Sequence, residues 1–99
     1  MGELKRCIHK YGCMPIGLNI TDAWYDTYGD LKGFIKSGGN HIGGHAVLCV
    51  GYNHSGVIIQ NSWGSDGWGE YGYATLSWED FEKQFIYGIV PLNCLNDFN

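Results

Sequence analysis

The sequence predicts an α+β fold, in which one helix leads into a mostly antiparallel sheet. Two observations support this prediction. Apolar side chains near the N-terminus recur at helical spacing, whereas much of the rest consists of short segments rich in β-branched and aromatic residues. The 99 residues suffice for a single domain with a modest core, to which the 15% of aromatic residues adds apolar area.

An N-terminal helix is expected over about 3–11. Leu4, Ile8 and Tyr11 would share one face of this helix. Gly12 follows, as is common just after the last turn of a helix. The apolar face of the helix predicts that it packs on the side of the sheet.

The remaining elements follow from alternation, turn residues and glycine content. Thr21 is a candidate N-cap for a short helical turn. The glycine-rich stretch of about 29–44 is expected to form a long surface loop, and such loops in small domains are usually functional. The sheet continues from about 45. The predicted segments are a strand at 14–20, a helical turn at 22–28, strands at 46–52, 56–61 and 71–77, a helix at 78–84 and a strand at 87–92.

The hairpin between the two central strands decides whether His45 and Asn61 share one face of the sheet. Directly opposed residues of an antiparallel pair share a face. His45 and Asn61 both have odd numbers, so they share a face only if the residue numbers of each opposed pair add to an even value. A three-residue turn at 53–55, with Gly56 as a bulge, gives that parity and places Asn61 opposite Val47. A turn of even length would place the His and the Asn on opposite faces.

Composition and charge argue against several classes of function. The net charge of -4 and the absence of a basic stripe argue against nucleic-acid binding. No stretch approaches the roughly 20 apolar residues of a membrane span. The N-terminus lacks the apolar region of a secretory signal, so a cytoplasmic location is expected. We expect no cofactor.

The cysteines are expected to be reduced thiols, because no export signal precedes them. In an oxidising compartment they would allow three disulfide pairings. No pair has CxxC spacing, and His41 with His45 lacks a third ligand, so no metal site is expected. The four cysteines are Cys7, Cys13, Cys49 and Cys94.

Several motifs follow one another in a fixed order, and sixteen positions separate His45 from Asn61. A His and an Asn brought together by paired strands are two of the three groups of a Cys-His-Asn hydrolase. The motifs are Gly12-Cys13-Met14-Pro15-Ile16, Gly44-His45-Ala46-Val47, Val50-Gly51-Tyr52, Asn61-Ser62-Trp63-Gly64 and Trp68-Gly69-Glu70-Tyr71-Gly72-Tyr73. This ordered set resembles the C-terminal, right-hand half-domain of the papain-like cysteine peptidases over roughly residues 4–92.

The resemblance implies a fold and a set of roles. The fold would be a papain-like half-domain over residues 1–99, its antiparallel sheet partly closed into a barrel with the N-terminal helix packed on it. His45 would be the general base and acid, and Asn61 would hold the imidazole in the correct tautomer. Trp63 would shield that hydrogen bond from water. The expected binding residues of the cleft are Trp63, Trp68, Gly43 and Gly44.

The nucleophile of that family has no match in this sequence. The family places it about 130–150 residues before the His and the Asn, whereas 44 residues precede His45 here. Cys49 would lie more than about 10 Å along the strand from His45. Cys13 follows the C-terminal end of the helix, where the helix dipole raises a thiol pKa. All four cysteines are therefore expected to be structural.

Three functions remain open. The chain is predicted first as a non-catalytic module, which keeps one wall of a peptidase cleft and binds or inhibits through it. Its ligand would be a peptide, a protein or a small molecule, and a homo-oligomer is expected. The alternative is one chain of a split cysteine peptidase, completed by a Cys-bearing partner. The third function is a scavenger of small molecules or peptides, or an inhibitor, whose pocket would be the aromatic rim and the long Gly-rich loop. Apart from these functions, His45 can also be a structural histidine, and the Trp motifs a packed aromatic loop.

Overall fold

A five-stranded antiparallel sheet forms the centre of the computed structural model, which describes residues 2–89. The strand order is β4-β3-β2-β1-β5. The α+β class is therefore as predicted. The elements are α1 (Gly2–Tyr11), β1 (Met14–Thr21), the 3-10 helix η1 (Asp22–Thr27), β2 (His41–Asn53), β3 (Gly56–Gln60), β4 (Tyr73–Ser77), α2 (Trp78–Gln84) and β5 (Phe85–Gly88).

Helix α1 buries Leu4 and Ile8, as its spacing predicted, but Tyr11 of the same predicted face is exposed. Leu4, Cys7 and Ile8 are its buried residues. Gly12 ends the helix with a positive φ of 84°, and its N–H donates to the carbonyl of Ile8 at 2.7 Å. A residue with a side chain adopts that φ less readily, which explains the glycine.

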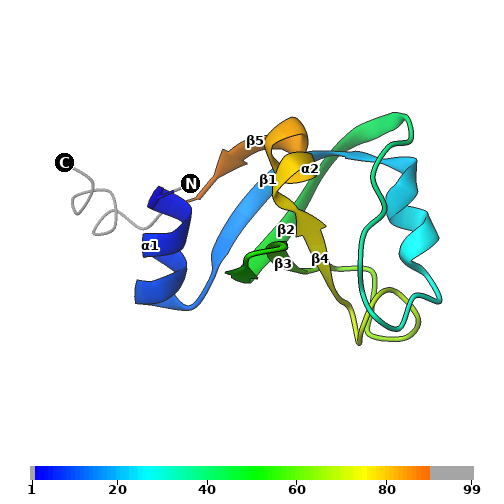
Figure 1. Ribbon diagram of the computed structural model, residues 1–99, viewed down its shortest axis with the longest axis horizontal. Helices are drawn as coiled ribbons and strands as arrows, with labels where there is room; N and C mark the ends of the chain where they lie inside the picture. The colour runs from blue at the N-terminus through cyan, green and yellow to red at the C-terminus, as the bar shows by residue number, and fades with distance from the viewer. Residues whose placement is uncertain (1, 90–99) are drawn as a thin grey trace.

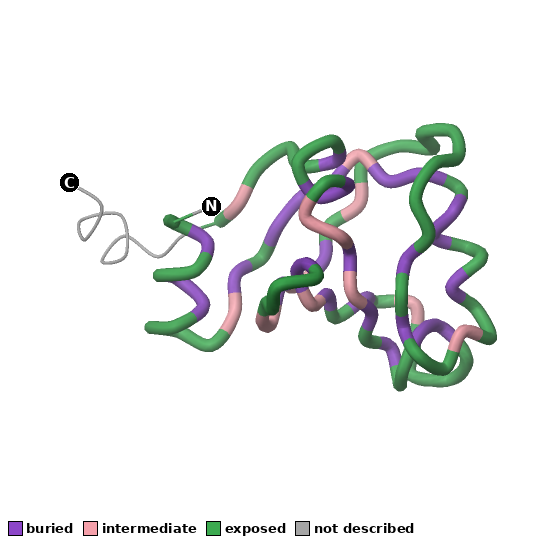
Figure 2. The backbone as a smooth tube through the Cα atoms, in the orientation of Figure 1, coloured by how far each residue is buried: buried purple, intermediate pink, exposed green. Residues whose placement is uncertain are grey.

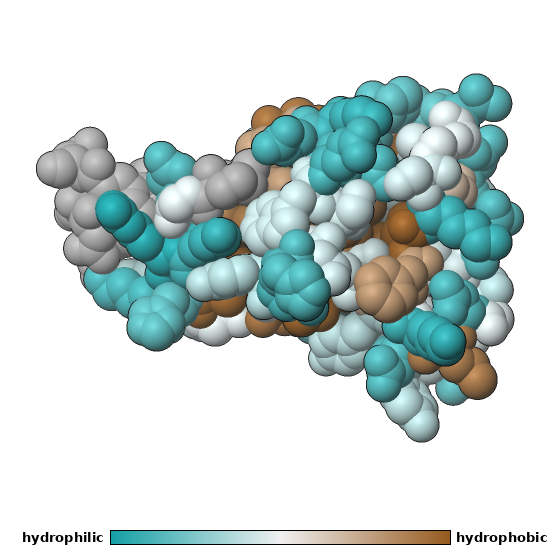
Figure 3. Space-filling model, in the orientation of Figure 1, coloured by the Kyte–Doolittle hydropathy of each residue, from teal (hydrophilic) through white to brown (hydrophobic). Residues whose placement is uncertain are grey.

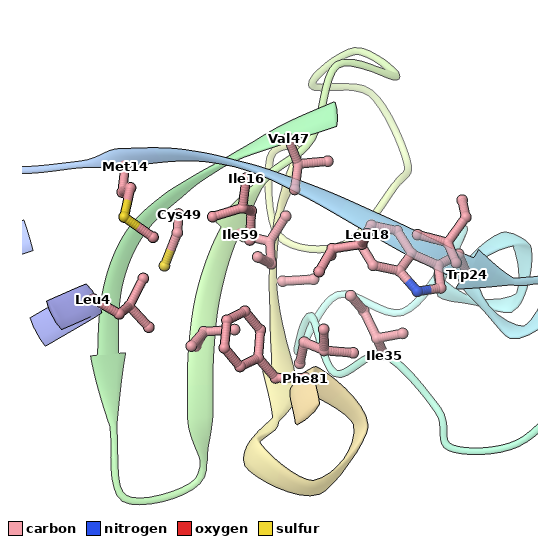
Figure 4. Close-up of a cluster of buried hydrophobic side chains, with 14 of the residues drawn as sticks. Leu4, Met14, Ile16, Leu18, Trp24, Ile35, Val47, Cys49, Ile59 and Phe81 are labelled. Carbon is pink, nitrogen blue, oxygen red and sulfur yellow. The ribbon is translucent and has the colours of Figure 1, made fainter. Parts of the chain in front are cut away.

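The core lies on one face of the sheet, under both α-helices. Buried residues alternate with less buried ones along β4 and the middle of β2, whereas most of β1 is buried (Figure 2). Leu4 of α1 and Phe81 of α2 belong to the same apolar cluster as the inward side chains of β1, β2 and β3 (Figure 4). In the space-filling view, hydrophilic side chains cover most of the visible face and apolar ones reach the surface in smaller patches (Figure 3). No helix among residues 2–89 is long and apolar enough to cross a membrane.

The sheet is open, so the predicted partial closure into a barrel is wrong. Strands β4 and β5 are its two edges, and residues 2–89 contain no pairing between them. Helix α2 directly joins β4 to β5 and packs against β1, β3 and β4. A barrel requires its two edge strands to meet. Here a helix carries the chain from one edge to the other across the core face.

Several predicted boundaries also differ from the structure. Strand β2 begins at His41, because Gly43 and Gly44 pair with β1 instead of belonging to the loop. Strand β4 begins at Tyr73, because Tyr71 and Gly72 have positive φ values of 54° and 88°. Strand β5 spans 85–88 instead of starting at 87, and positions 90–92 of that prediction lie outside the described residues.

Thr21 occupies the N-cap position of η1, but its side chain forms no cap hydrogen bond. The backbone N–H of Asp22 donates to the carbonyl of Asn40 at 2.9 Å instead. The Asp22 carboxylate accepts the Asn40 N–H at 3.1 Å in return. This reciprocal pair ties the end of the glycine-rich loop to the start of η1.

The predicted turn length was wrong, yet the predicted shared face is correct. Asn53 pairs with Gly56, so the turn has two residues, and the Asn53 side chain accepts the N–H groups of Ser55 and Gly56. That register alone would place His45 and Asn61 on opposite faces. A β-bulge between Cys49 and Gly51 shifts the register by one residue. The parity therefore comes from a bulge within β2 and not at Gly56.

Candidate active site

His45 and Asn61 meet on the core face of the sheet. His45 lies in β2, opposite Leu18 of β1, and Asn61 directly follows the last residue of β3. The Nε2 atom of His45 is 2.7 Å from Oδ1 of Asn61. The Asn side chain is 8% exposed, and the His is half-buried. The two residues thus form a short, largely buried hydrogen bond across sixteen positions of sequence.

The backbone of Ser62 fixes which proton this hydrogen bond uses. Its N–H donates to Oδ1 of Asn61 at 2.8 Å, and an N–H group can only donate. The amide atom that faces His45 is therefore the oxygen, so the Nε2 atom of His45 must carry the proton. In the neutral imidazole, Nδ1 then keeps its lone pair. That atom has no hydrogen-bond partner among residues 2–89 and can act as a base.

The amide nitrogen of Asn61 has a different environment. Its Nδ2 atom is buried and has no hydrogen-bond partner among the described residues. A buried donor left without an acceptor costs about 1–3 kcal/mol. Flipping the amide would point Nδ2 at two donors, Nε2–H of His45 and the N–H of Ser62, so the observed orientation is the better one.

Two tryptophans surround the imidazole. The ring centroid of Trp63 lies 5.0 Å from that of His45, with the planes tilted by 31°. Trp24 presents an edge at 6.0 Å, with an interplanar angle of 88°. The Nε1–H of Trp24 donates to Oε1 of Gln84 at 3.0 Å. The imidazole is thus held by flat apolar surfaces as well as by Asn61, which restricts how far its ring can turn.

Trp68 lies inside the core instead of on the cleft. It is fully buried, stacks on Trp24 at 5.7 Å, and donates its Nε1–H to the Trp24 carbonyl at 2.7 Å. Its indole has no exposed surface to offer a ligand. Trp68 instead positions Trp24, which contacts the imidazole of His45.

The loop between β3 and β4 is docked on η1, which places Trp63 beside His45. The N–H of Gly69 donates to the Thr27 carbonyl at 3.0 Å, and the N–H of Gly29 donates to the Gly67 carbonyl at 2.7 Å. At Gly69 a Cβ atom would lie 2.3 Å from the Tyr73 carbonyl oxygen. Only glycine fits this approach, so the sequence Trp68-Gly69 is required by packing.

Gly43 and Gly44 are the exposed residues of β2 that precede His45. A Cβ atom at either position would meet nothing within 4 Å. The backbone next to the imidazole is therefore bare.

The described thiols lie away from the imidazole. Cys49 is four residues along β2 from His45, about 13 Å in an extended strand. Its side chain lies in the core near Leu4 and Met14 (Figure 4). Burial raises the pKa of the Cys49 thiol to about 11, so it is protonated at neutral pH. Cys13 adjoins Met14, the partner of Cys49 in β1, and Cys94 lies outside the described residues.

No metal site replaces this arrangement within residues 2–89, where no group of three or more His, Cys, Asp or Glu side chains is placed to hold an ion. The Nδ1 atom of His41 lies 3.0 Å from the Asn19 carbonyl oxygen. His41 therefore has a structural partner on β1, and its ring does not join that of His45.

Three aromatic neighbours of His45 and Trp63 were not singled out from the sequence. Trp24 contacts His45, and Tyr25 and Tyr28 both stack on Trp63. These residues belong to the aromatic-rich run Ala23-Trp24-Tyr25-Asp26-Thr27-Tyr28. The density of aromatic side chains in that run was the available signal. Their contacts span up to 60 positions and cannot be read from local pattern.

Comparison with known proteins finds similarity to cysteine proteases. The model of the family described as papain family cysteine protease matches residues 1–87. A viral cathepsin of Antheraea pernyi nuclear polyhedrosis virus is 37% identical over 75 residues, which are 72% of this chain and 22% of the cathepsin. Papain of Carica papaya is 50% identical over 43 residues, which are 43% of this chain and 12% of papain.

A solved structure shares the fold. It is that of xylellain, a cysteine protease from Xylella fastidiosa, with a TM-score of 0.65 and 27% identity. The match covers 83% of this chain and 32% of xylellain. The chain thus spans about a fifth of the length of the viral cathepsins and about a third of xylellain.

Proposed function

Because this chain belongs to the papain family of cysteine proteases, we propose that it supplies the general base of a peptide-hydrolysing site whose thiolate comes from outside residues 2–89. His45 is that base, and Asn61 is the amide that orients it. The observation that supports this proposal is the 2.7 Å hydrogen bond between them, which leaves Nδ1 of His45 without a partner within those residues.

The chemistry of His45 follows from this orientation. Nδ1 takes the proton of a cysteine thiol, and the thiolate attacks the carbonyl carbon of a peptide bond, forming a carbon–sulfur bond. The imidazolium then gives the proton to the leaving amine as the carbon–nitrogen bond breaks. In the second half of the reaction Nδ1 takes a proton from the water that attacks the acyl carbon. The carbon–sulfur bond then breaks, and the imidazolium returns the proton to the leaving sulfur. Throughout, Oδ1 of Asn61 accepts the Nε2–H and stabilises the positive charge.

Two further observations support completion of the site by another polypeptide segment. The buried Nδ2 of Asn61 lacks an acceptor among residues 2–89, and a carbonyl of a docked segment would satisfy it. The relatives are several times longer than the matched region, so most of their length has no counterpart in this chain. The Cys-bearing partner is therefore a segment of a papain-like protein.

The second candidate is the non-catalytic binding or inhibitory module that the missing nucleophile suggested. In that function His45 and Asn61 would be a structural pair, and the exposed strand around Gly43 and Gly44 would bind a peptide, a protein or a second copy. The Nε2 tautomer favours the peptidase, because a purely structural pair has no need of an unpartnered Nδ1.

The test is to complete the site. The chain would be fused behind the part of the Antheraea pernyi virus cathepsin that precedes the aligned region, where the family resemblance places the cysteine. We expect hydrolysis of a fluorogenic peptide by the fusion, its loss after alkylation of the thiol, and no hydrolysis by the chain alone. A folded fusion whose thiol is alkylated but which cleaves no peptide would favour the non-catalytic module.

A further inference from the structure

Two tyrosines extend the aromatic surface beyond the imidazole. The rings of Tyr25 and Tyr28 lie 5.3 and 6.2 Å from the ring of Trp63, and each is within 7° of parallel to it. The 3-10 helix η1 (the cyan helical segment of Figure 1) carries Tyr25, and Tyr28 follows its last residue. Residues three apart eclipse one another on such a helix, so Asp22, Tyr25 and Tyr28 form one row.

Both phenol rings remain accessible. Tyr25 is 53% exposed and Tyr28 is 47% exposed, although both stack on Trp63. Both phenol rings lie nearly parallel to the ring of Trp63, and together they present an exposed aromatic surface. We call it the tyrosine surface, formed by the rings of Tyr25 and Tyr28.

Acidic residues predominate in the two segments that build the tyrosine surface, and Lys32 directly follows the first of them. These two segments, 21–31 and 61–72, contain five of the ten acidic residues of the chain and none of its six Lys and Arg residues. Asp26 is exposed and has no hydrogen-bond or ion-pair partner among residues 2–89. The five residues are Asp22, Asp26, Asp30, Asp66 and Glu70.

We propose that the tyrosine surface is a subsite for an arginine side chain of the peptide substrate. A planar guanidinium stacks on aromatic faces, and its charge is attracted both by the rings and by the surrounding carboxylates. An anionic side chain would be repelled by the same carboxylates. A lysine ammonium would gain the charge attraction but not the flat stacking. This assignment of substrate class rests on the proposed peptidase function.

The position of the surface places that arginine close to the cleaved bond. The ring of Trp63 lies 5.0 Å from the His45 ring and 5.3 Å from that of Tyr25. The tyrosine surface therefore starts within about 10 Å of the catalytic imidazole, two to three residues of extended peptide.

The test uses the isolated chain and needs no thiol. A ¹⁵N-labelled sample is titrated with acetyl-Ala-Arg-Ala-amide, and separately with the same peptide carrying neutral citrulline in place of arginine. The indole N–H signal of Trp63 is followed by NMR, assigned with a Trp63→Phe variant. We expect a saturable shift with the arginine peptide and about two- to fivefold weaker binding of the citrulline peptide.

Variants locate the binding. Tyr25→Ala and Tyr28→Ala should abolish the shift, whereas Tyr25→Phe should keep it, because the ring face binds and not the hydroxyl. Asp26→Asn should weaken binding of the arginine peptide and leave that of the citrulline peptide unchanged. The matched control is Tyr11→Ala, since Tyr11 is a 39% exposed tyrosine at the end of α1, at the other end of the molecule (Figure 1). This control should bind as the parent does.

Equal affinity for arginine and citrulline peptides, absence of a saturable shift, or unchanged binding by Tyr25→Ala and Tyr28→Ala would each overturn the assignment. A failure of the proposed peptidase function gives a different pair of results from a failure of the arginine subsite. Arginine binding to the chain without hydrolysis by the completed fusion would contradict the peptidase function alone. Hydrolysis without arginine binding would contradict the subsite alone.

Discussion

The Nε2 atom of His45 and the Oδ1 atom of Asn61 lie 2.7 Å apart, although sixteen residues separate them in the sequence. A strand pair, a bulge and a backbone N–H from Ser62 together produce this contact. Its consequence is chemical, because it assigns the proton of the imidazole to one nitrogen. The other nitrogen is then an oriented base.

The first prediction concerns the tautomer of His45. Nitrogen NMR of the neutral imidazole should show the proton on Nε2, because Oδ1 of Asn61 can only accept it. In Asn61→Ala the signals should move toward a mixture of both tautomers. A parent protein with its proton on Nδ1 would contradict the assigned orientation.

The second prediction compares the orienting amide with the base in the completed fusion. Asn61→Ala should lower kcat/KM, since the imidazole loses its fixed partner. The loss should be smaller than the roughly 10²–10⁴-fold expected when a general acid–base group is removed. Steady-state kinetics with a fluorogenic peptide measure both losses, and a larger loss in Asn61→Ala than in His45→Ala would count against these roles.

The third prediction separates the two tryptophans of the loop between β3 and β4. Trp68→Ala should lower the free energy of unfolding by about 3–5 kcal/mol, because the side chain is fully buried and its N–H is hydrogen bonded. Trp63→Ala should lower the free energy of unfolding by clearly less than Trp68→Ala does, since Trp63 is only partly buried. Urea denaturation of both variants measures this difference, and equal losses would show that Trp63 is a core residue.

The fourth prediction concerns Cys49 and alkaline pH. Burial raises the pKa of this thiol from 9.0 to about 11, so the thiol ionises first in the unfolded chain. Its contribution to stability is complete below pH 9 and is lost as the pH rises toward 11. Urea denaturation between pH 8 and 11 should show that the free energy of unfolding falls more steeply with pH in the parent than in Cys49→Ala. The same dependence on pH in both proteins would contradict the raised pKa of a buried thiol.

The sequence was sufficient where local pattern decides the structure. Helix α2 spans Trp78–Gln84, as predicted, because Ser77 caps it by accepting the N–H of Asp80. The shared face of His45 and Asn61 was also predicted correctly. The cause of that shared face was not predicted. The structure has a bulge between Cys49 and Gly51, and the glycine within the strand pattern was the available signal.

The features that the sequence did not reveal depend on contacts between distant segments. Gly43 and Gly44 look like loop residues, but backbone pairing with β1 makes them part of a strand. The open sheet results from the path of α2, which no local pattern specifies. The stacking of Tyr25 on Trp63 joins residues 38 positions apart, so only the docking of η1 against the following loop reveals it.

The most direct test of the account is the effect of removing the base from the completed fusion, measured against a matched histidine on the same strand. His41 lies four residues before His45 in β2 and contacts the Asn19 carbonyl. We predict that His45→Ala lowers the rate of peptide hydrolysis by about 10²-fold or more, while His41→Ala retains the parent rate. Folded variants with equal rates would contradict the assignment of His45 as the general base.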